Sequence, residues 1–233
     1  MPSQLSLSLS LRDEATFANF LAPTGSLRAQ AVQVLQGELN PGETLCYLWG
    51  GQGSGISHAI QATCHHFSAT MRTAQYLPLA DLLELDPEAL LAGLEWQALV
   101  CLKDVHLIQG KLTWERAIFN LFNRTRDAGN LLVVAADRAP RDLVLSLPDL
   151  HSRLSSGIVY HFGAYTDREK GDILRFRASR LGLDMSDEVA HFILSRGGRD
   201  LAHLMTCLQQ LDKASLRAQR KITIPFVKTV FGW

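Results

Sequence analysis

Apolar and polar residues alternate along most of the chain in blocks of helical and extended period. Apolar residues at helical spacing predict helices at 27–36, 57–68 and 114–129. Apolar runs and strand-like stretches between them predict strands at 45–50, 74–79, 98–103, 131–136 and 158–162. Helices that alternate with wholly apolar strands are typical of a parallel sheet that is covered on both faces. The larger part of the chain is therefore expected to be an α/β domain.

The pattern changes at Thr166, where strand signals stop. The run TDRE places Glu three residues after Thr166, the signature of a capping box at a helix N-terminus. Gly182 should end this helix and Ser186 should begin the next one. Helical spacing at 199–219 and a proline at Pro225 predict two more helices. The expected domains are a flexible tail at 1–11, an α/β base at 12–164 and a helical lid at 165–233.

The sequence GGQGSGISH at 50–58 follows a predicted strand and precedes a predicted helix, as in a phosphate-binding loop. Its glycines let the backbone fold around an anion, and the helix N-terminus adds partial positive charge. Ser57 supplies the hydroxyl that contacts magnesium in such loops. A glycine-rich turn without a ligand is the alternative. The expected nucleotide contacts here are Gly51, Gln52, Gly53, Ser54, Gly55, Ile56, Ser57 and His58.

Two positions depart from the pattern of a nucleotide hydrolase. Ile56 stands where such loops carry the lysine that pairs with the β- and γ-phosphates. After the strand at 98–103, Lys103 and Asp104 occupy the two positions where acidic residues would hold magnesium and assist catalysis. One hypothesis is that Lys103 reaches the phosphates and replaces both the loop lysine and the metal; the other is that it points to solvent. Under the first, the site binds an ADP-like nucleoside diphosphate with little need for magnesium.

Composition excludes several classes of protein. The chain has 233 residues, of which 47% are hydrophobic and 20% charged, which indicates a globular fold with a buried core. No apolar run approaches the ~18–20 residues that a membrane helix needs, and no export signal is recognisable. The four cysteines are widely spaced and are expected to be buried, reduced thiols of a cytoplasmic protein.

Several segments, in order, resemble the AAA+ module of the bacterial replication initiator DnaA, and more closely that of the Hda family of DnaA-homologous inactivators. They are GGQGSGISH, LVCLKDVHLI, WERAIFNLFNR, LVVAADRAPRDL and LPDLHSRL. The resemblance covers nearly the whole chain, from QLSLSL to ITIPFVKTVF. It implies an AAA+ P-loop base with a parallel sheet, followed by a small helical lid.

The resemblance implies further contacts to a nucleotide. Asp137 falls where this family has its first sensor. The second sensor is an arginine in the family, but Ala202 occupies that position; Arg199, three residues earlier on a predicted helix, could substitute. The missing arginine is a further argument against ATP hydrolysis by this chain. The segment TFANF at 16–20 is similar to the family segment before the loop, and its candidate contacts to the base are Phe17, Asn19 and Phe20.

The segment LPDLHSRL at 147–154 is similar to the arginine-finger segment of the family, with Arg153 as the finger. An arginine presented in trans stabilises the charge that develops on the phosphates of another subunit, and can accelerate hydrolysis by ~10³–10⁵-fold. From the residues alone, a surface arginine at the end of a helix is an equally good interpretation.

The segment QLSLSL at 4–9 is similar to the sliding-clamp-binding peptide with which Hda proteins begin. An extended peptide with a few side-chain anchors is a known recognition mode, in which glutamine bonds at the rim and leucines fill an apolar groove. By itself, such alternation is also typical of a flexible terminus. The expected clamp-binding residues are Gln4, Leu5, Leu7 and Leu9.

Together these features predict an adaptor for the regulatory inactivation of DnaA. The tail binds the β sliding clamp of DNA polymerase III, and Arg153 stimulates hydrolysis of DnaA-bound ATP, which prevents re-initiation of replication. Sequence-specific DNA binding is not expected, because no basic recognition helix follows the predicted lid. Self-association as a homodimer is compatible with this arrangement. The alternatives are an autonomous ATPase and a clamp-associated AAA+ loader or adaptor for another client.

Overall fold

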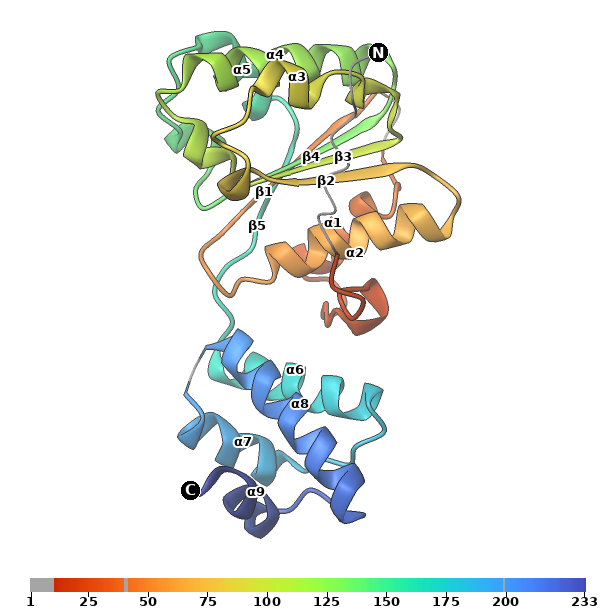
Figure 1. Cartoon of the computed structure of the whole chain (residues 1–233), viewed down its shortest axis with the longest axis vertical. Helices are drawn as coiled ribbons and strands as arrows, with labels where there is room; N and C mark the ends of the chain where they lie inside the picture. Colours follow the sequence, from red (N-terminus) through yellow and green to blue (C-terminus); the bar gives the residue numbers. More distant parts are fainter. Residues whose placement is uncertain (1–10, 40–41, 199) are drawn as a thin grey trace. The chain divides into compact units, whose positions relative to one another are not determined.

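The computed structural model describes residues 11–39, 42–198 and 200–233 (Figure 1). The chain divides into two compact units, Met1–Gly163 and Ala164–Trp233, called here the first and the second unit. The predicted tail, with Gln4, Leu5, Leu7 and Leu9, lies outside the described residues except for its last position. Among the described residues, none of the helices combines the length and the apolar character that crossing a membrane requires.

The first unit is built on a five-stranded parallel sheet, in the order β2-β3-β4-β1-β5. All five predicted strands are present and the α/β class is confirmed. The central strand β4 is buried along its whole length, as a strand covered on both faces must be. The strands are β1 (Leu45–Trp49), β2 (Ala74–Pro78), β3 (Leu99–Lys103), β4 (Leu131–Ala136) and β5 (Ile158–His161).

Helices cover both faces of this sheet (Figure 1). One face carries α1 (Leu27–Leu35) and α2 (Ile56–Ala69); the other carries α3 (Pro87–Leu91), α4 (Leu112–Asp127) and α5 (Pro148–Ser155). Successive side chains of a strand point to opposite faces, so each face has its own core. Along β1, Cys46 and Leu48 pack in the core beneath α2, whereas Tyr47 packs in the core beneath α4.

In the first unit, α3 was not predicted, and α5 was considered only as the helix at whose end Arg153 would lie. The helix α3 has five residues and α5 has eight, which is too short for apolar spacing to distinguish a helix from an irregular segment. Both begin with a proline in the first turn, where the missing N–H has no partner to lose. Five short 3₁₀ segments were missed as well; they are η1 (Phe17–Asn19), η2 (Leu79–Asp81), η3 (Leu94–Trp96), η4 (Val105–Ile108) and η5 (Pro140–Asp142).

The second unit contains four helices among its described residues and has its own apolar core. The predicted capping box is confirmed: the Thr166 side chain accepts from the Glu169 N–H at 3.2 Å, and the Glu169 carboxylate accepts from the Thr166 N–H at 2.7 Å. Gly182, with φ of 74°, ends this helix in the left-handed region. The helices are α6 (Asp167–Arg180), α7 (Asp187–Arg196), α8 (Leu201–Ala218) and α9 (Ile224–Phe231).

The four cysteines are free and buried, as expected. They are Cys46, Cys64, Cys101 and Cys207. Burial raises the pKa of the Cys46 thiol to about 12 and also raises the pKa of Cys207. A thiol with a raised pKa holds its proton at neutral pH and is a poor nucleophile. Cys46 and Cys207 therefore serve as small apolar side chains of the core.

Candidate functional site

The glycine loop, residues 50–55, connects β1 to α2 at the carboxyl edge of the sheet. The Gly50 N–H donates to the carbonyl of Ala136 at the end of β4, at 3.2 Å. A Cβ atom at Gly50 would lie 2.2 Å from the carbonyl oxygen of Phe162, the residue after β5. Only glycine fits at this position. The first residue of the loop is thus fixed by the ends of the two neighbouring strands.

The rest of the loop turns back on itself and begins α2. Gly53 and Gly55 have φ of 76° and 93°, in the left-handed region that favours glycine. The Ser54 N–H donates to the Gly51 carbonyl at 3.2 Å, which closes the turn. Gly55 is the N-cap of α2, and no described side chain caps the helix there. The N–H groups of its first turn therefore face outward at the positive end of the helix, where an anion can bind.

Position 56, the lysine position of a hydrolytic loop, belongs to the core in this protein. Ile56 is only 7% exposed and packs with the apolar residues between α1, α2 and the sheet. Ser57, the next residue, is exposed. The side chain that follows the glycines thus contributes packing rather than charge, and Ser57 alone of the two is available to a ligand.

The segment around η1 packs on α2 beside the loop. The ring of Phe20 lies 5.3 Å from that of His58 and 6.4 Å from that of Phe162, measured between centroids. A ring nitrogen of His58 bonds to the Thr16 carbonyl at 2.9 Å. Phe17 lies edge-on to His66, with centroids 6.0 Å apart. Two of the residues predicted near the nucleotide, Phe20 and His58, are thus brought together at the start of α2, whereas Phe17 packs on His66 in the last turn of the helix.

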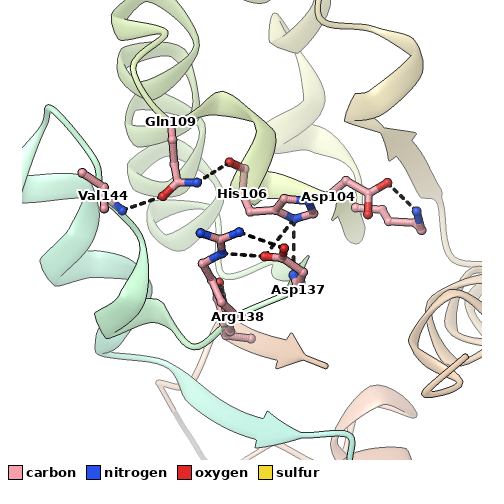
Figure 2. Close-up of polar contacts among 8 residues, drawn as sticks. Asp104, His106, Gln109, Asp137, Arg138 and Val144 are labelled. Atoms are coloured by element: carbon pink, nitrogen blue, oxygen red, sulfur yellow. Dashed lines mark hydrogen bonds and ion pairs between the residues drawn. The ribbon is translucent and has the colours of Figure 1, made fainter. Parts of the chain in front are cut away.

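At the end of β3, Lys103 and Asp104 form an ion pair with each other (Figure 2). Both side chains are 23% exposed. Asp104 has φ of 64°, an uncommon value for a residue other than glycine, and it begins η4. The Lys103 ammonium thus stays at the end of β3, paired with Asp104, and does not extend freely into solvent. A phosphate would have to compete with Asp104 for it.

At the end of β4, Asp137 is held by its neighbours (Figure 2). Arg138 donates to both carboxylate oxygens, from Nε at 2.7 Å and from Nη2 at 2.9 Å. The Asp137 N–H donates to Nδ1 of His106 at 3.2 Å. The hydrogen bonds from Arg138, with a smaller contribution from His106, lower the pKa of Asp137. The Tyr47 hydroxyl in turn donates to the Arg138 carbonyl at 3.0 Å.

The guanidinium of Arg153, in the last turn of α5, is in a different situation. It lies over the ring of Phe122 of α4, 5.8 Å from the centroid. Arg126 lies at the same distance from this ring, but it is paired with Asp127 at 2.9 Å. Within the described parts of the chain, no carboxylate pairs with Arg153. A cation–π contact holds its side chain without neutralising its charge.

The sheet brings together most of the residues predicted from sequence. The glycine loop follows β1, Lys103 ends β3 and is followed by Asp104, and Asp137 follows β4. These three strands are neighbours, so the residues lie at one carboxyl edge. Such an edge is the common place for ligands in open α/β sheets. The side-chain amide of Asn19 already donates a hydrogen bond to the Glu14 carbonyl, at 3.0 Å. Arg199 lies outside the described residues.

Four residues at or near this edge were missed by the sequence reasoning. They are His106, Gln109, Glu115 and Arg138. For Glu115 a signal existed: it lies three residues before Ile118 and seven before Phe122, on the apolar stripe of the predicted helix. A charged residue at such a position indicates a buried polar contact. The other three are ordinary polar residues in predicted loops.

Comparison with known families decides the classification. The model "Hda, lid domain" matches residues 167–231, and the model "Bacterial DnaA ATPase domain" matches residues 93–161. A protein of Haemophilus influenzae, described only as an uncharacterised protein, is 40% identical over 233 residues, which is 100% of both chains. The chain is an Hda-like member of the DnaA-homologous AAA+ family.

Solved structures share the fold of this Hda-like chain. Domain III of the Thermotoga maritima replication initiation protein DnaA superimposes with a TM-score of 0.75 at 21% identity, covering 96% of this chain and 98% of that one. AMPPCP-bound DnaA from Aquifex aeolicus gives a TM-score of 0.72 at 20% identity, covering 90% and 71%. The predicted resemblance and the AAA+ fold are confirmed.

Proposed function

We propose that this Hda-like chain is an adaptor that inactivates DnaA by stimulating hydrolysis of DnaA-bound ATP, and that it does not itself hydrolyse nucleotide. The observation that carries the proposal is the state of Arg153. Its guanidinium has no carboxylate partner among the described residues and lies over Phe122. An arginine held in this way can give its full charge to phosphates of another protein. The protein would act in the cytoplasm and limit initiation of replication.

The proposal is tested with Arg153→Ala in an assay of phosphate release from DnaA-ATP, in the presence of clamp-loaded DNA. Loss of the finger should lower the stimulated rate by at least ~10³-fold if it acts as other trans-acting arginines do. Arg126→Ala is the matched control, because Arg126 lies over the same ring but is already paired with Asp127. Full stimulation by Arg153→Ala would refute the assignment of Arg153 as the finger and would favour the alternative, an adaptor for another client.

We further propose that the chain's own site binds an ADP-like nucleoside diphosphate. The glycine loop, the uncapped N-terminus of α2 and the exposed Ser57 support binding. The apolar Ile56 and the paired Lys103 argue against stabilisation of a γ-phosphate in transfer. The DnaA of Aquifex aeolicus binds AMPPCP in its solved structure, which supports a nucleotide in this family.

Calorimetric titration of ADP, with and without EDTA, tests this second proposal. If Lys103 reaches the phosphates, wild type should bind ADP equally well in EDTA, and Lys103→Ala should bind it several-fold more weakly. Asp104→Asn should tighten binding, by up to about fivefold, because it removes the competitor for Lys103. An equal loss of affinity for ADP on adding EDTA, in wild type and in Lys103→Asp, would show that magnesium and not Lys103 neutralises the phosphates.

Docking on the β sliding clamp is proposed from the resemblance of QLSLSL alone, since these residues lie outside those that the structure describes. Replacing Leu7 and Leu9 by alanine should abolish binding to the clamp in a titration by fluorescence anisotropy, because both anchors are lost. Ser6→Ala with Ser8→Ala is the matched control, since it changes the same stretch without touching an anchor. A homodimer also stays a prediction, which sedimentation of the purified chain with ADP would decide.

A further inference from the structure

A fully buried carboxylate joins two loops in the first unit. Glu115, near the start of α4, is 0% exposed. Its Oε1 accepts from the N–H of Gly110, at 3.1 Å, and its Oε2 accepts from the N–H of Leu147, at 2.8 Å. Gly110 follows η4, and Leu147 is the N-cap of α5. Each oxygen thus holds the backbone of a different loop.

Gln109 makes a second bridge between the same two loops. Its side-chain amide donates to the His106 carbonyl at 2.8 Å, and its Oε1 accepts from the Val144 N–H at 2.6 Å (Figure 2). The segment 103–110, which carries Lys103 and Asp104 at the sheet edge, is therefore tied twice to the segment 144–147. The latter leads directly into α5.

Burial of a carboxylate is costly, and packing alone would not require it. Trp114, Ile118 and Leu121 of α4 already supply the apolar contacts to the core. Without Glu115, the N–H groups of Gly110 and Leu147, which belong to an exposed and a half-buried residue, would lose their acceptor, and the buried carboxylate has these two N–H groups as its hydrogen-bond donors. A carboxylate with two N–H donors is a strong and directional contact. Its effect is to fix both backbones relative to α4 and to each other.

The position of α5 decides where the Arg153 guanidinium lies. Pro148, the first residue of α5, has its φ set by its ring, so the backbone at Leu147 directs the start of the helix. Arg153 follows in the last turn of the same short helix. Catalysis by positioning is sensitive to small errors: a displacement of about 1 Å can lower a rate by ~10²-fold.

We propose that Glu115 and Gln109 are positioning residues for Arg153, which hold the start of α5 to the segment 103–110 of the chain's own sheet edge. The inference rests on the proposed function, since it concerns the reach of the finger. Neither side chain would touch the nucleotide of the partner. Both act through the backbone N–H groups of residues 144 and 147.

Two variants test the inference in the assay of DnaA-ATP hydrolysis. Glu115→Gln keeps the shape but turns an NH₂ group toward one of the two N–H donors, and Gln109→Met keeps the length but removes both hydrogen bonds. Each should lower the maximal stimulated rate by about ten- to a hundredfold, with no change in the adaptor concentration that gives half of that rate. Glu95→Gln is the control, because Glu95 also joins a loop to α4, through Arg124 at 3.2 Å, but does not reach α5.

Three comparisons keep the test decisive. Added to Arg153→Ala, Glu115→Gln or Gln109→Met should lower the rate no further, because the finger that they position is gone. Hydrogen exchange of the backbone N–H at 144 and 147 should be faster in both variants and unchanged in Glu95→Gln. Loss of rate in Arg153→Ala with a wild-type rate in folded Gln109→Met and Glu115→Gln would overturn the inference alone. A wild-type rate in Arg153→Ala would overturn the proposed function instead.

Discussion

The charged side chains at the sheet edge are paired with partners of opposite charge, whereas the arginine at the end of α5 has no carboxylate partner among the described residues. At the edge, Lys103 is paired with Asp104, and Asp137 is held by Arg138. On α5, Arg153 lies over an aromatic ring, and within the described chain no carboxylate neutralises it. A ligand at the edge must displace existing partners, whereas a phosphate that meets Arg153 has no competitor. The difference is consistent with the proposed function, in which the sheet edge holds a nucleotide and Arg153 acts on the nucleotide of another protein.

The largest expected effect tests whether the backbone of the glycine loop is as fixed as its contacts indicate. Gly50→Ala places a Cβ 2.2 Å from the Phe162 carbonyl, so it should lower the free energy of unfolding by about 3 kcal/mol. Gly51→Ala is the matched control, because a Cβ there meets nothing within 4 Å. Its effect should stay within about 0.5 kcal/mol. Chemical denaturation measures both, and equal stabilities of the two variants would contradict the assigned geometry.

A smaller effect is expected when the missing lysine is returned to the loop. Ile56→Lys puts an ammonium where an apolar side chain is 7% exposed, and should lower the free energy of unfolding by about 2 kcal/mol. It should not create ATP turnover, because the edge still lacks an acidic residue at position 103. Ile56→Val is the control for lost packing alone. Turnover of ATP by Ile56→Lys in a phosphate-release assay would contradict this expectation and show that the missing lysine alone prevents hydrolysis at the sheet edge.

Removal of Arg153 should matter little to folding. Its described contact is the cation–π contact to Phe122, which is worth about 0.5–1 kcal/mol at exposed sites. Arg153→Ala should therefore keep most of its thermal stability while losing the proposed activity. Arg124→Ala is a useful contrast, because Arg124 bonds both to Glu95 and to the Leu91 carbonyl. If Arg153→Ala unfolds more readily than Arg124→Ala, the finger is a structural residue.

The smallest effect concerns the pH dependence of the Asp137 contacts. Because the pKa of Asp137 is lowered in the fold, its ionised form stabilises the protein above the ordinary value of about 3.9, and this contribution is lost as the pH falls below it. The side chain is 41% exposed, so screening should limit the contribution to a few tenths of a kcal/mol. Urea denaturation of wild type and Asp137→Asn, from about pH 6 to about pH 3, should show the larger loss in wild type. If the free energies of unfolding of wild type and Asp137→Asn change with pH in parallel, the contact between Asp137 and Arg138 does not contribute to stability.

The elements that could be predicted are those whose sequence pattern is long or distinctive. Predominantly apolar runs located β1 to β5, and the TDRE box located the N-cap of α6 at Thr166. The glycines of the loop predicted its place between β1 and α2. By contrast, α5 has only eight residues, so its leucine spacing was too short to establish a helix, although the resemblance had already singled out its Arg153.

The details of the candidate site were less accessible for physical reasons. The position of Lys103 after its strand and the family resemblance at Asp137 marked both residues as candidates for the site. Neither could show that Lys103 is already paired with Asp104 and Asp137 with Arg138, because such pairs depend on local backbone and rotamer geometry. The inward direction of Ile56 depends on how α2 packs on the sheet. Glu115 was detectable as a charge on an apolar stripe, but its partners come from two loops that are distant from one another in sequence.

The close approach of Gly50 to the Phe162 carbonyl also has a consequence for biosynthesis. The glycine loop is translated early, but β5 and the residue after it are translated much later. A nascent chain on the ribosome carries the loop sequence long before the carbonyl that confines its first residue has emerged. Competence to bind a nucleotide should therefore arise late in synthesis, when β5 docks beside β1, and not when the loop itself leaves the exit tunnel.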